Sequence, residues 1–267
     1  MTAGGVPVSP TFRRLLPSPG VLTTDDDLET AYAVAAAATD RVHLRANFVA
    51  SVDGAAVAAG QSAGLSSAAD KRVFGVLRRL ADVVLVGAGT ARSEHYGPAT
   101  MSDERRTRRV RRGFAPGLPI AVVSNRLDLD PSSPIFAGAR ADSRTIVVTH
   151  AAAPAQARAA LSEVADVVDC GATQVEIDAV LPALFERGLR RVLCEGGPTL
   201  FGELVGAGLV DELCLSVAPL IAGPGSPRIA MGAPVPAGAA PLEVTPTLLL
   251  ESGGLLLARY VRRAASR

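Results

Sequence analysis

The chain has 267 residues, and its 48% of hydrophobic residues is enough for a sizeable core and excludes an intrinsically disordered protein. Its formal net charge is +1, so no general attraction to nucleic acid or to an anionic membrane is expected. Three cysteines without a CxxC spacing and three scattered histidines argue against a zinc site, and we expect no bound metal ion.

The distribution of apolar residues predicts where the protein resides. No basic segment followed by an apolar one opens the sequence, and no apolar run reaches the roughly 18 residues that a membrane span needs. The odd, sparse cysteine count suits a reducing compartment. We therefore expect a cytoplasmic protein.

The N-terminal segment differs in composition from the rest of the chain. Residues 1–24 are rich in Pro, Gly, Ser and Thr, which is typical of an extended arm. Three aspartates at 25–27 precede an Ala-rich stretch that ends near Ala38. Acidic residues in a first turn complement the helix dipole, so this stretch predicts a short helix. We therefore treat residues 1–41 as an arm with a short helix.

From residue 42 onward, short apolar runs alternate with helical patterns. The apolar runs predict strands at 42–49, 83–86, 120–123, 145–149, 191–194, 213–220, 247–251 and 254–261. Capping residues and periodicity predict helices at 66–80, 154–162, 174–187 and 198–205. Such alternation indicates a largely parallel sheet covered on both faces, and the Ser252-Gly253-Gly254 turn makes the last two strands antiparallel. We expect an α/β fold with a mixed, mostly parallel sheet in one domain over 42–267.

Two segments inside this domain lack such patterns. Residues 104–112 include six arginines and are interpreted as a solvated surface loop, with a binding patch as the alternative. Residues 223–241 are rich in Gly, Pro and Ala and are also expected to be a loop.

The strongest local motif is the sequence VLCEGGPTL at 192–200. A strand ends, two glycines turn the chain, and a proline begins a helix. The unpaired N–H groups at such a helix start suit a diphosphate, which glycine allows to approach the backbone. The alternative is an ordinary strand-to-helix turn, and the GxGxxG fingerprint of the Rossmann fold is absent.

Two further strand ends carry similar signals. Gly87-Ala88-Gly89-Thr90 repeats the plan of strand, glycine turn and helix, with a threonine hydroxyl beside the free N–H groups. Two such turns in one parallel sheet favour a dinucleotide more than either does alone. Asp53-Gly54 also follows a strand, although Asp-Gly at such a position is usually a turn device.

In combination the motifs resemble the reductase domain of bacterial riboflavin biosynthesis, the C-terminal half of the bifunctional deaminase–reductase. The resemblance covers about residues 42–261 and is carried by Ala50-Ser51-Val52-Asp53-Gly54, Ser66-Ser67, Leu77-Arg78, Ala81-Asp82, Val86-Gly87-Ala88-Gly89-Thr90, Glu195-Gly196-Gly197-Pro198-Thr199-Leu200, Leu209-Val210-Asp211-Glu212-Leu213 and Ala218-Pro219-Leu220. It implies a dihydrofolate-reductase-like fold, usually as a homodimer. It also implies NADPH-dependent reduction of a ribosylamino-pyrimidine 5′-phosphate, with hydride transfer to an imine carbon.

The resemblance and the two glycine turns together assign site residues. The residues expected to contact the cofactor are Ala50, Gly87, Thr90, Glu94, Ser124, Arg126, Gly196, Gly197, Pro198, Thr199, Leu200 and Phe201. The residues expected to contact the substrate are Ser62, Arg78 and Glu195. Asp53 and Glu195 are the candidate catalytic acids, Glu195 through substrate contact and Asp53 through site geometry or proton relay.

The strand end at 120–123 predicts the choice of cofactor. In a dihydrofolate-reductase-like fold this end lies beside the adenosine ribose. The Ser124 hydroxyl and the Arg126 guanidinium can then bind the 2′-phosphate that distinguishes NADPH from NADH. The alternative is a simple polar turn.

The sequence departs from the family pattern in two ways. It has no HxE or PCxxC motif, so it is not expected to be the bifunctional deaminase–reductase. The family usually places an Arg for the substrate phosphate after the threonine turn, whereas no Arg follows Arg92 until Arg105 here. Three functions stay open: a pyrimidine-ribosylamine reductase, a dihydrofolate-type reductase acting on a pterin, and a non-catalytic NADPH-binding protein.

Overall fold

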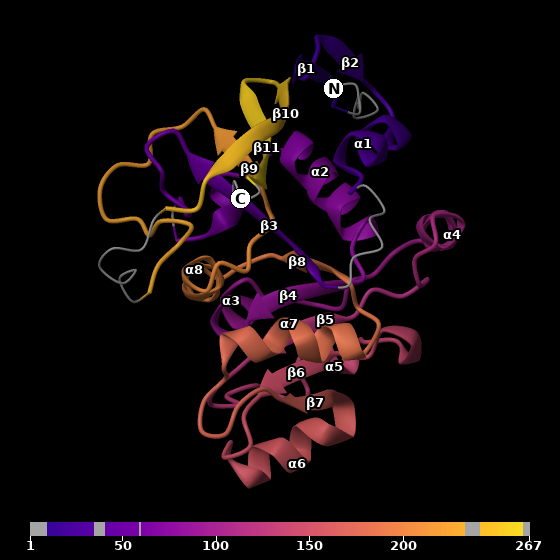
Figure 1. The fold of residues 1–267 in the computed structure, drawn as a ribbon, viewed down its shortest axis with the longest axis vertical. Helices are drawn as coiled ribbons and strands as arrows, with labels where there is room; N and C mark the ends of the chain where they lie inside the picture. The colour runs from indigo at the N-terminus through magenta and orange to yellow at the C-terminus, as the bar shows by residue number, and fades with distance from the viewer. Residues whose placement is uncertain (1–9, 35–40, 59, 233–240, 264–267) are drawn as a thin grey trace, which may run out of the picture.

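The computed structural model describes residues 10–34, 41–58, 60–232 and 241–263, in which eleven strands form one continuous sheet (Figure 1). The strands are β1 (Phe12–Leu16), β2 (Gly20–Leu22), β3 (His43–Ser51), β4 (Val83–Gly87), β5 (Ile120–Val123), β6 (Ile146–Thr149), β7 (Asp166–Asp169), β8 (Arg191–Cys194), β9 (Glu212–Ala218), β10 (Val244–Ser252) and β11 (Leu255–Arg262). Their order across the sheet is β2-β1-β10-β11-β9-β3-β8-β4-β5-β6-β7.

The sheet is mixed and mostly parallel, as the sequence predicts. The run from β9 through β3 and β8 to β7 is parallel throughout. The strands β11, β10, β1 and β2 add an antiparallel end, which lies at the top of Figure 1. The carboxyl ends of the parallel strands therefore meet at one edge of the sheet, where ligands bind in open α/β sheets.

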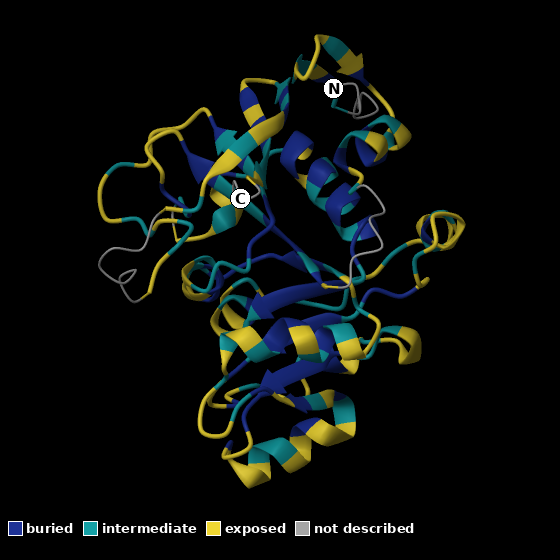
Figure 2. Ribbon diagram, viewed as in Figure 1, coloured by how far each residue is buried: buried dark blue, intermediate teal, exposed yellow. Residues whose placement is uncertain are grey.

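Helices cover both faces of the sheet. They are α1 (Asp25–Tyr32), α2 (Ala68–Arg79), α3 (Ala88–Ser93), α4 (Asp103–Arg111), α5 (Pro134–Ala137), α6 (Ala155–Val164), α7 (Ile177–Glu186) and α8 (Pro198–Gly206). Alternate residues of β4 enter two separate cores: Val84 and Val86 pack with α1, α2, α5 and α6, and Val83 and Leu85 pack with α7 and α8. Figure 2 shows the resulting pattern of buried strands under half-exposed helices. No helix within the described residues is long and apolar enough to cross a membrane.

Three sequence-based expectations differ from the structure. The predicted arm contains β1 and β2, and Phe12 is fully buried because β1 pairs with β10 near the other end of the chain. The strand β7 was not predicted, because aspartates stand at both of its ends. The interpretation of 104–112 as a loop is wrong, since α4 spans most of it and Ser102 caps that helix. Parts of the arm (1–9), of the predicted first helix (35–38) and of the 223–241 segment (233–240) lie outside the described residues.

Carboxylates distant in sequence explain why the arginine-rich segment is helical. Arg108 and Arg112 form ion pairs with Asp26 of α1, at 2.8 and 3.2 Å. Arg109 is only 1% exposed and donates hydrogen bonds to the backbone carbonyls of Arg79 and Ala81 at 3.0 and 2.9 Å. Because its partners are neutral, burial lowers the pKa of Arg109 to about 10. The helix is therefore attached to α1 and to the C-terminal end of α2.

A buried carboxylate joins the two parts of the sheet. The Glu212 side chain on β9 is fully buried and accepts hydrogen bonds from Arg45 Nε of β3 at 2.6 Å and from Arg259 Nε of β11 at 2.9 Å. The same two arginines donate to the carbonyls of Tyr32 and Ala31 at the end of α1. Although burial opposes it, Arg45, His43 and Arg259 hold the pKa of Glu212 well below its usual range.

Glu212→Gln should destabilise the fold by about 3–5 kcal/mol, because the buried Arg45 and the half-buried Arg259 would lose their counter-charge. Urea denaturation measures this change. The matched control is Glu243→Gln, which removes one partner of an ion pair in which both side chains are largely exposed, with Arg263, and should change stability by less than about 0.5 kcal/mol. Equal losses in the two variants would contradict the role of Glu212.

The pH dependence of that difference has a defined sign. The folded-state pKa of Glu212 is lowered, so its contribution is fully present above the unfolded-state pKa and is lost as pH falls through the folded-state value. The stability gap between wild type and Glu212→Gln should therefore narrow in strong acid and remain constant near neutrality.

Candidate functional site

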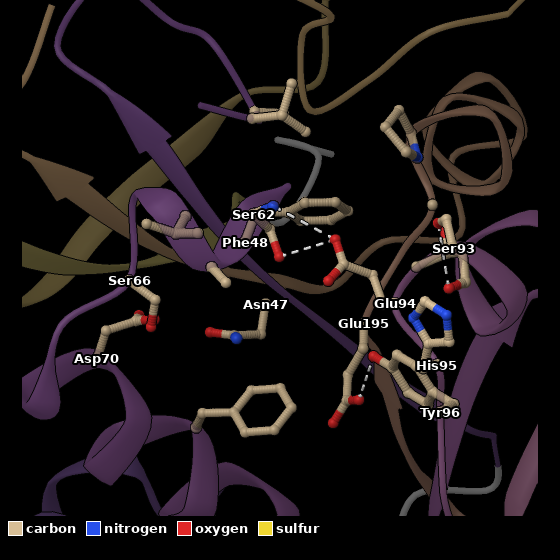
Figure 3. A pocket seen from close by; sticks show the side chains of 18 of the residues that line it. Asn47, Phe48, Ser62, Ser66, Asp70, Ser93, Glu94, His95, Tyr96 and Glu195 are labelled. Atoms are coloured by element: carbon tan, nitrogen blue, oxygen red, sulfur yellow. Dashed lines mark hydrogen bonds between the residues drawn. The ribbon is translucent and has the colours of Figure 1, made fainter. Parts of the chain in front are cut away.

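A cavity of about 560 Å³ opens at the carboxyl edge of the parallel strands, between β3, α2, α3 and the end of β8 (Figure 3). This volume is within the range of small-molecule sites. Of the residues that the sequence assigns to a site, seven line the cavity: Ser62, Arg78, Thr90, Glu94, Glu195, Gly197 and Pro198. No group of His, Cys, Asp and Glu side chains suited to a metal ion occurs in the part of the chain that the structure describes.

Glu195 is the centre of a buried polar cluster in this cavity. Its carboxylate accepts two hydrogen bonds from Arg78, from Nε and Nη2, both at 2.7 Å. The Tyr96 hydroxyl donates to the same carboxylate at 2.8 Å (Figure 3). The Arg78 guanidinium also lies 4.4 Å from the centre of the Phe74 ring. Arg78 is therefore not an exposed helix arginine. Because its Nε and Nη2 groups already donate to Glu195, they are not free to bind a substrate.

Charge and burial fix the protonation of this cluster. Burial, and then the negative charge of Glu195, raise the pKa of Tyr96 well above its ordinary value. Although burial opposes it, Glu195 raises the pKa of Arg78. Tyr96 thus remains a hydrogen-bond donor and Arg78 a cation, and both donate to the Glu195 side chain between them.

A second polar pair lies across the cavity from the Glu195 cluster. The Ser62 hydroxyl, on the short 3₁₀ helix Ser62–Gly64, donates to Glu94 Oε1 at 3.1 Å (Figure 3). Glu94 follows α3 directly as its C-terminal cap. The predicted substrate residue Ser62 and the predicted cofactor residue Glu94 therefore contact each other.

The two glycine turns lie side by side. The Gly87 N–H donates to the Gly196 carbonyl at 2.8 Å, and a Cβ added at Gly197 would collide with Thr90 Oγ1. Neither α8, which starts after Gly197, nor α3, which starts after Gly87, has a side-chain cap, whereas Ser67 caps α2. Two helix starts with unpaired N–H groups thus lie beside the cavity, and these features fit an anionic diphosphate.

Asp53 does not line the cavity. Its exposed carboxylate accepts hydrogen bonds from the Ser51 hydroxyl and from the backbone N–H groups of Ala222 and Gly223. The Ser51 hydroxyl, followed by these N–H groups, lowers the pKa of Asp53 to about 2. Of its two predicted roles, the geometry favours the one in shaping the site, because Asp53 holds the turn after β3 against the segment after β9.

The predicted cofactor residues beyond the cavity fall into two groups. Ser124 and Arg126 follow β5, the neighbour of β4: the Ser124 hydroxyl accepts from the Leu127 N–H at 3.0 Å, and Arg126 is exposed with no described ion-pair partner. The others do not line the cavity, although several adjoin residues that do: Ala50, Gly87, Gly196, Thr199, Leu200 and Phe201. The ring of Phe201, for example, packs against that of Phe48, which lines the cavity, and the two ring centroids are 4.6 Å apart.

Sequence reasoning missed Asn47, Asp70, Lys71, Phe74 and Tyr96, all of which line the cavity. One signal was available: Lys71, Phe74 and Arg78 are spaced at i, i+3 and i+7 on the predicted helix, which places them on one face. The single lysine of a chain with 26 arginines is on that face.

The chain is similar to known proteins both in sequence and in fold. The model of the RibD C-terminal domain family matches residues 42–253. The 2,5-diamino-6-ribosylamino-4(3H)-pyrimidinone 5′-phosphate reductase of Archaeoglobus fulgidus is 31% identical over 169 residues, which are 63% of this chain and 76% of that protein. A pyrimidine reductase-like protein from Corynebacterium diphtheriae superposes with a TM-score of 0.74 and 26% identity, over 84% of this chain and 92% of that one.

A more distant structure shares the fold alone. The diaminohydroxyphosphoribosylaminopyrimidine deaminase/5-amino-6-(5-phosphoribosylamino)uracil reductase of Thermotoga maritima superposes with a TM-score of 0.62 at 18% identity, over 84% of this chain and 57% of that one. The predicted α/β fold with a mixed, mostly parallel sheet is thereby confirmed, and these reductases share it.

Proposed function

The chain belongs to the RibD C-terminal domain family, and from this premise we propose that it is an NADPH-dependent reductase of a ribosylamino-pyrimidine 5′-phosphate. Its reaction class is that of the pyrimidine reductases of riboflavin biosynthesis. The observation that carries the proposal is the position of the Glu195, Arg78 and Tyr96 cluster in the same cavity as the Gly196-Gly197 turn. A substrate held by the cluster and a diphosphate held by the turn would then lie side by side.

Different residues of the cavity would bind NADPH and the substrate. NADPH, when bound, supplies the hydride. The uncapped start of α8 and the Thr90 hydroxyl would hold its diphosphate. Lys71, for which no described residue provides an ion pair, offers positive charge for the substrate 5′-phosphate in place of the arginine that the family uses. Competition by inorganic phosphate would test this role of Lys71.

Glu195 is the group placed to move a proton. A ribosylamine accepts hydride only after its sugar ring has opened to an imine, and this opening removes a proton from the amine nitrogen. The Glu195 carboxylate, oriented by Arg78 and Tyr96, accepts that proton on Oε, and the freed ring oxygen takes a proton from water to become a hydroxyl. Glu195 returns its proton to the nitrogen once the carbon has been reduced. The hydrogen bonds from Arg78 and Tyr96 fix the orientation of this side chain.

Glu195→Gln should lower kcat or kcat/KM on the order of 10²-fold, because the amide keeps the shape but cannot accept the proton. NADPH oxidation with the ribosylamino-pyrimidine 5′-phosphate, and with dihydrofolate in parallel, measures the loss. Asp53→Asn is the matched comparison and should cost less, since Asp53 lies outside the cavity and stays ionised with a pKa of about 2.

Each alternative has its own outcome in this assay. Turnover of dihydrofolate alone would indicate the pterin reductase, and NADPH binding without turnover of either compound would indicate a non-catalytic protein. Wild-type kinetics in Glu195→Gln would reject the proton-transfer role even if the pyrimidine is the substrate.

Arg126→Ala should weaken the binding of NADPH by about ten- to a hundredfold. Hydrogen bonds to charged groups contribute about 1.5–3 kcal/mol, and 1.4 kcal/mol corresponds to a factor of ten in affinity. Binding of NADH, which has no 2′-phosphate, should barely change. The measurement is KM for both cofactors in wild type and variant. Equal losses for the two cofactors, or no loss for either, would show that Arg126 does not bind the 2′-phosphate.

The sheet also offers a surface for self-association. Leu213, Leu215 and Val217 of β9 alternate with buried residues and are half-buried, and β11 sets Tyr260 and the exposed Leu256 beside them. We expect this apolar face to form a twofold dimer interface. Light scattering should give twice the 27.3 kDa of one chain, and Leu215→Arg should shift the mass to that of a monomer. A wild-type mass of one chain at micromolar concentration would refute the dimer.

A further inference from the structure

His95 is a residue of the cavity wall that the proposed mechanism does not use. Of the three histidines, all of which the structure describes, it alone lines the cavity. Figure 3 shows its imidazole between the side chains of Glu94 and Tyr96. Both neighbours are held in hydrogen bonds, Glu94 with Ser62 and Tyr96 with Glu195. His95 itself is exposed, and its ring has no hydrogen bond or ion pair with the described residues.

The backbone conformation at His95 favours glycine over histidine. The helix α3 ends in a Schellman turn, in which the His95 N–H donates to the Arg92 carbonyl at 3.2 Å and the Tyr96 N–H donates to the Ala91 carbonyl at 2.9 Å. The residue at the position of His95 in such a turn is left-handed, here with a φ of 50°, and is usually glycine. Because glycine would complete the turn without a strained Cβ, the turn does not account for the imidazole, and its place in the cavity does.

Opening the ribose ring needs an acid as well as a base. When the bond between C1′ and the ring oxygen O4′ breaks, its electron pair goes to the oxygen, which then needs a proton to become a hydroxyl. The amine nitrogen and O4′ are bonded to the same carbon, so the base and the acid must reach neighbouring atoms. Glu195 is the base in the proposed function, and its hydrogen-bond donor Tyr96 follows His95 directly in the chain.

The two groups that donate to Glu195 are poorly suited to act as this acid. The Tyr96 hydroxyl is already engaged with Glu195, and burial raises its pKa well above the ordinary value. Although burial opposes it, Glu195 raises the pKa of Arg78. A group that holds its proton so tightly is a weak general acid, whereas an imidazolium is the side chain that most often donates protons near neutral pH.

We infer that His95 is the general acid that opens the sugar ring. The inference rests on the proposed function and adds a catalytic residue to it. Glu195 takes the proton of the amine N–H, the electron pair of that bond forms the C1′=N bond, and the His95 imidazolium gives its proton to O4′ as the C1′–O4′ bond breaks. The neutral imidazole then takes a proton from water, so water remains the source of the hydroxyl proton.

Exchange between the two anomers of the ribosylamino-pyrimidine 5′-phosphate measures ring opening directly, because the anomers interconvert through the open imine. NMR exchange spectroscopy of the C1′ position, with the full chain and no NADPH, should show that wild type accelerates this exchange. His95→Gly should slow both the exchange and kcat on the order of 10²-fold. Its Tm should not fall, because glycine suits the left-handed conformation. Free imidazole should restore part of both rates in this variant.

Arg92→Gln is the matched control. Arg92 is an exposed residue of α3 outside the cavity, so this variant should keep the wild-type exchange rate and kcat. His95→Asn is a second test, since asparagine tolerates the left-handed conformation but cannot act as the acid, and it should lose as much activity as His95→Gly.

The two measurements separate this inference from the proposed function. Anomer exchange that depends on His95, without reduction of the compound, would reject the proposed reduction and support the role of His95. Reduction by wild type with unchanged exchange and kcat in His95→Gly would overturn the role of His95 alone. A loss in His95→Gly that free imidazole does not restore would assign His95 to the shape of the turn and would also overturn its role as an acid. Neither exchange nor reduction by wild type would overturn both.

Discussion

The buried Glu212 carboxylate is the interaction on which the arrangement of this fold depends. A carboxylate without solvent is stable only when cations are held against it, and here Arg45 and Arg259 come from the two strands that flank β9. Those arginines also bind the last carbonyls of α1, so one charge fixes the parallel strands, the antiparallel strands and the first helix together. The wall of the cavity formed by β3 is positioned by this network, since Arg45 lies two residues before Asn47.

A second chain of contacts positions α2, which supplies the opposite wall. Arg109 donates to carbonyls at the C-terminal end of α2, where the backbone carbonyl of Arg78 is also one of its acceptors. Arg78 in turn holds Glu195 at the end of β8. At the other end of the helix, Ser67 caps the backbone and Ser66 holds Asp70. The helix thus presents a cation at one end and a carboxylate at the other, both fixed before any ligand binds, and such preorganisation lowers the cost of binding.

The three carboxylates of the cavity differ in the groups that donate hydrogen bonds to them. Glu195 is matched by Arg78, Glu94 accepts from Ser62, and Asp70 accepts from one hydroxyl alone. Their chemistry differs for that reason: the first is suited to holding or moving a proton, and the last makes a hydrogen bond with the described residues through only one of its two oxygens. Asp53, which a strand-end pattern places beside them, is instead saturated by donors of its own chain outside the cavity.

The sequence by itself determined the elements whose signal is local. The strand, two-glycine turn and proline that precede α8 form one contiguous pattern, and the order of short apolar strands and helices was sufficient for a mixed, mostly parallel sheet. It also identified Glu195, Arg78, Ser62 and Thr90, all of which line the cavity. Only the tertiary structure decided that Asp53 is outside the cavity and Asp70 inside, that β1 joins the sheet beside β10, and that the arginine-rich segment is a helix. The physical reason is the same in each case: the partners that decide burial and charge, such as Asp26 for Arg108 or β10 for Phe12, lie about 80 to more than 200 residues away in the chain.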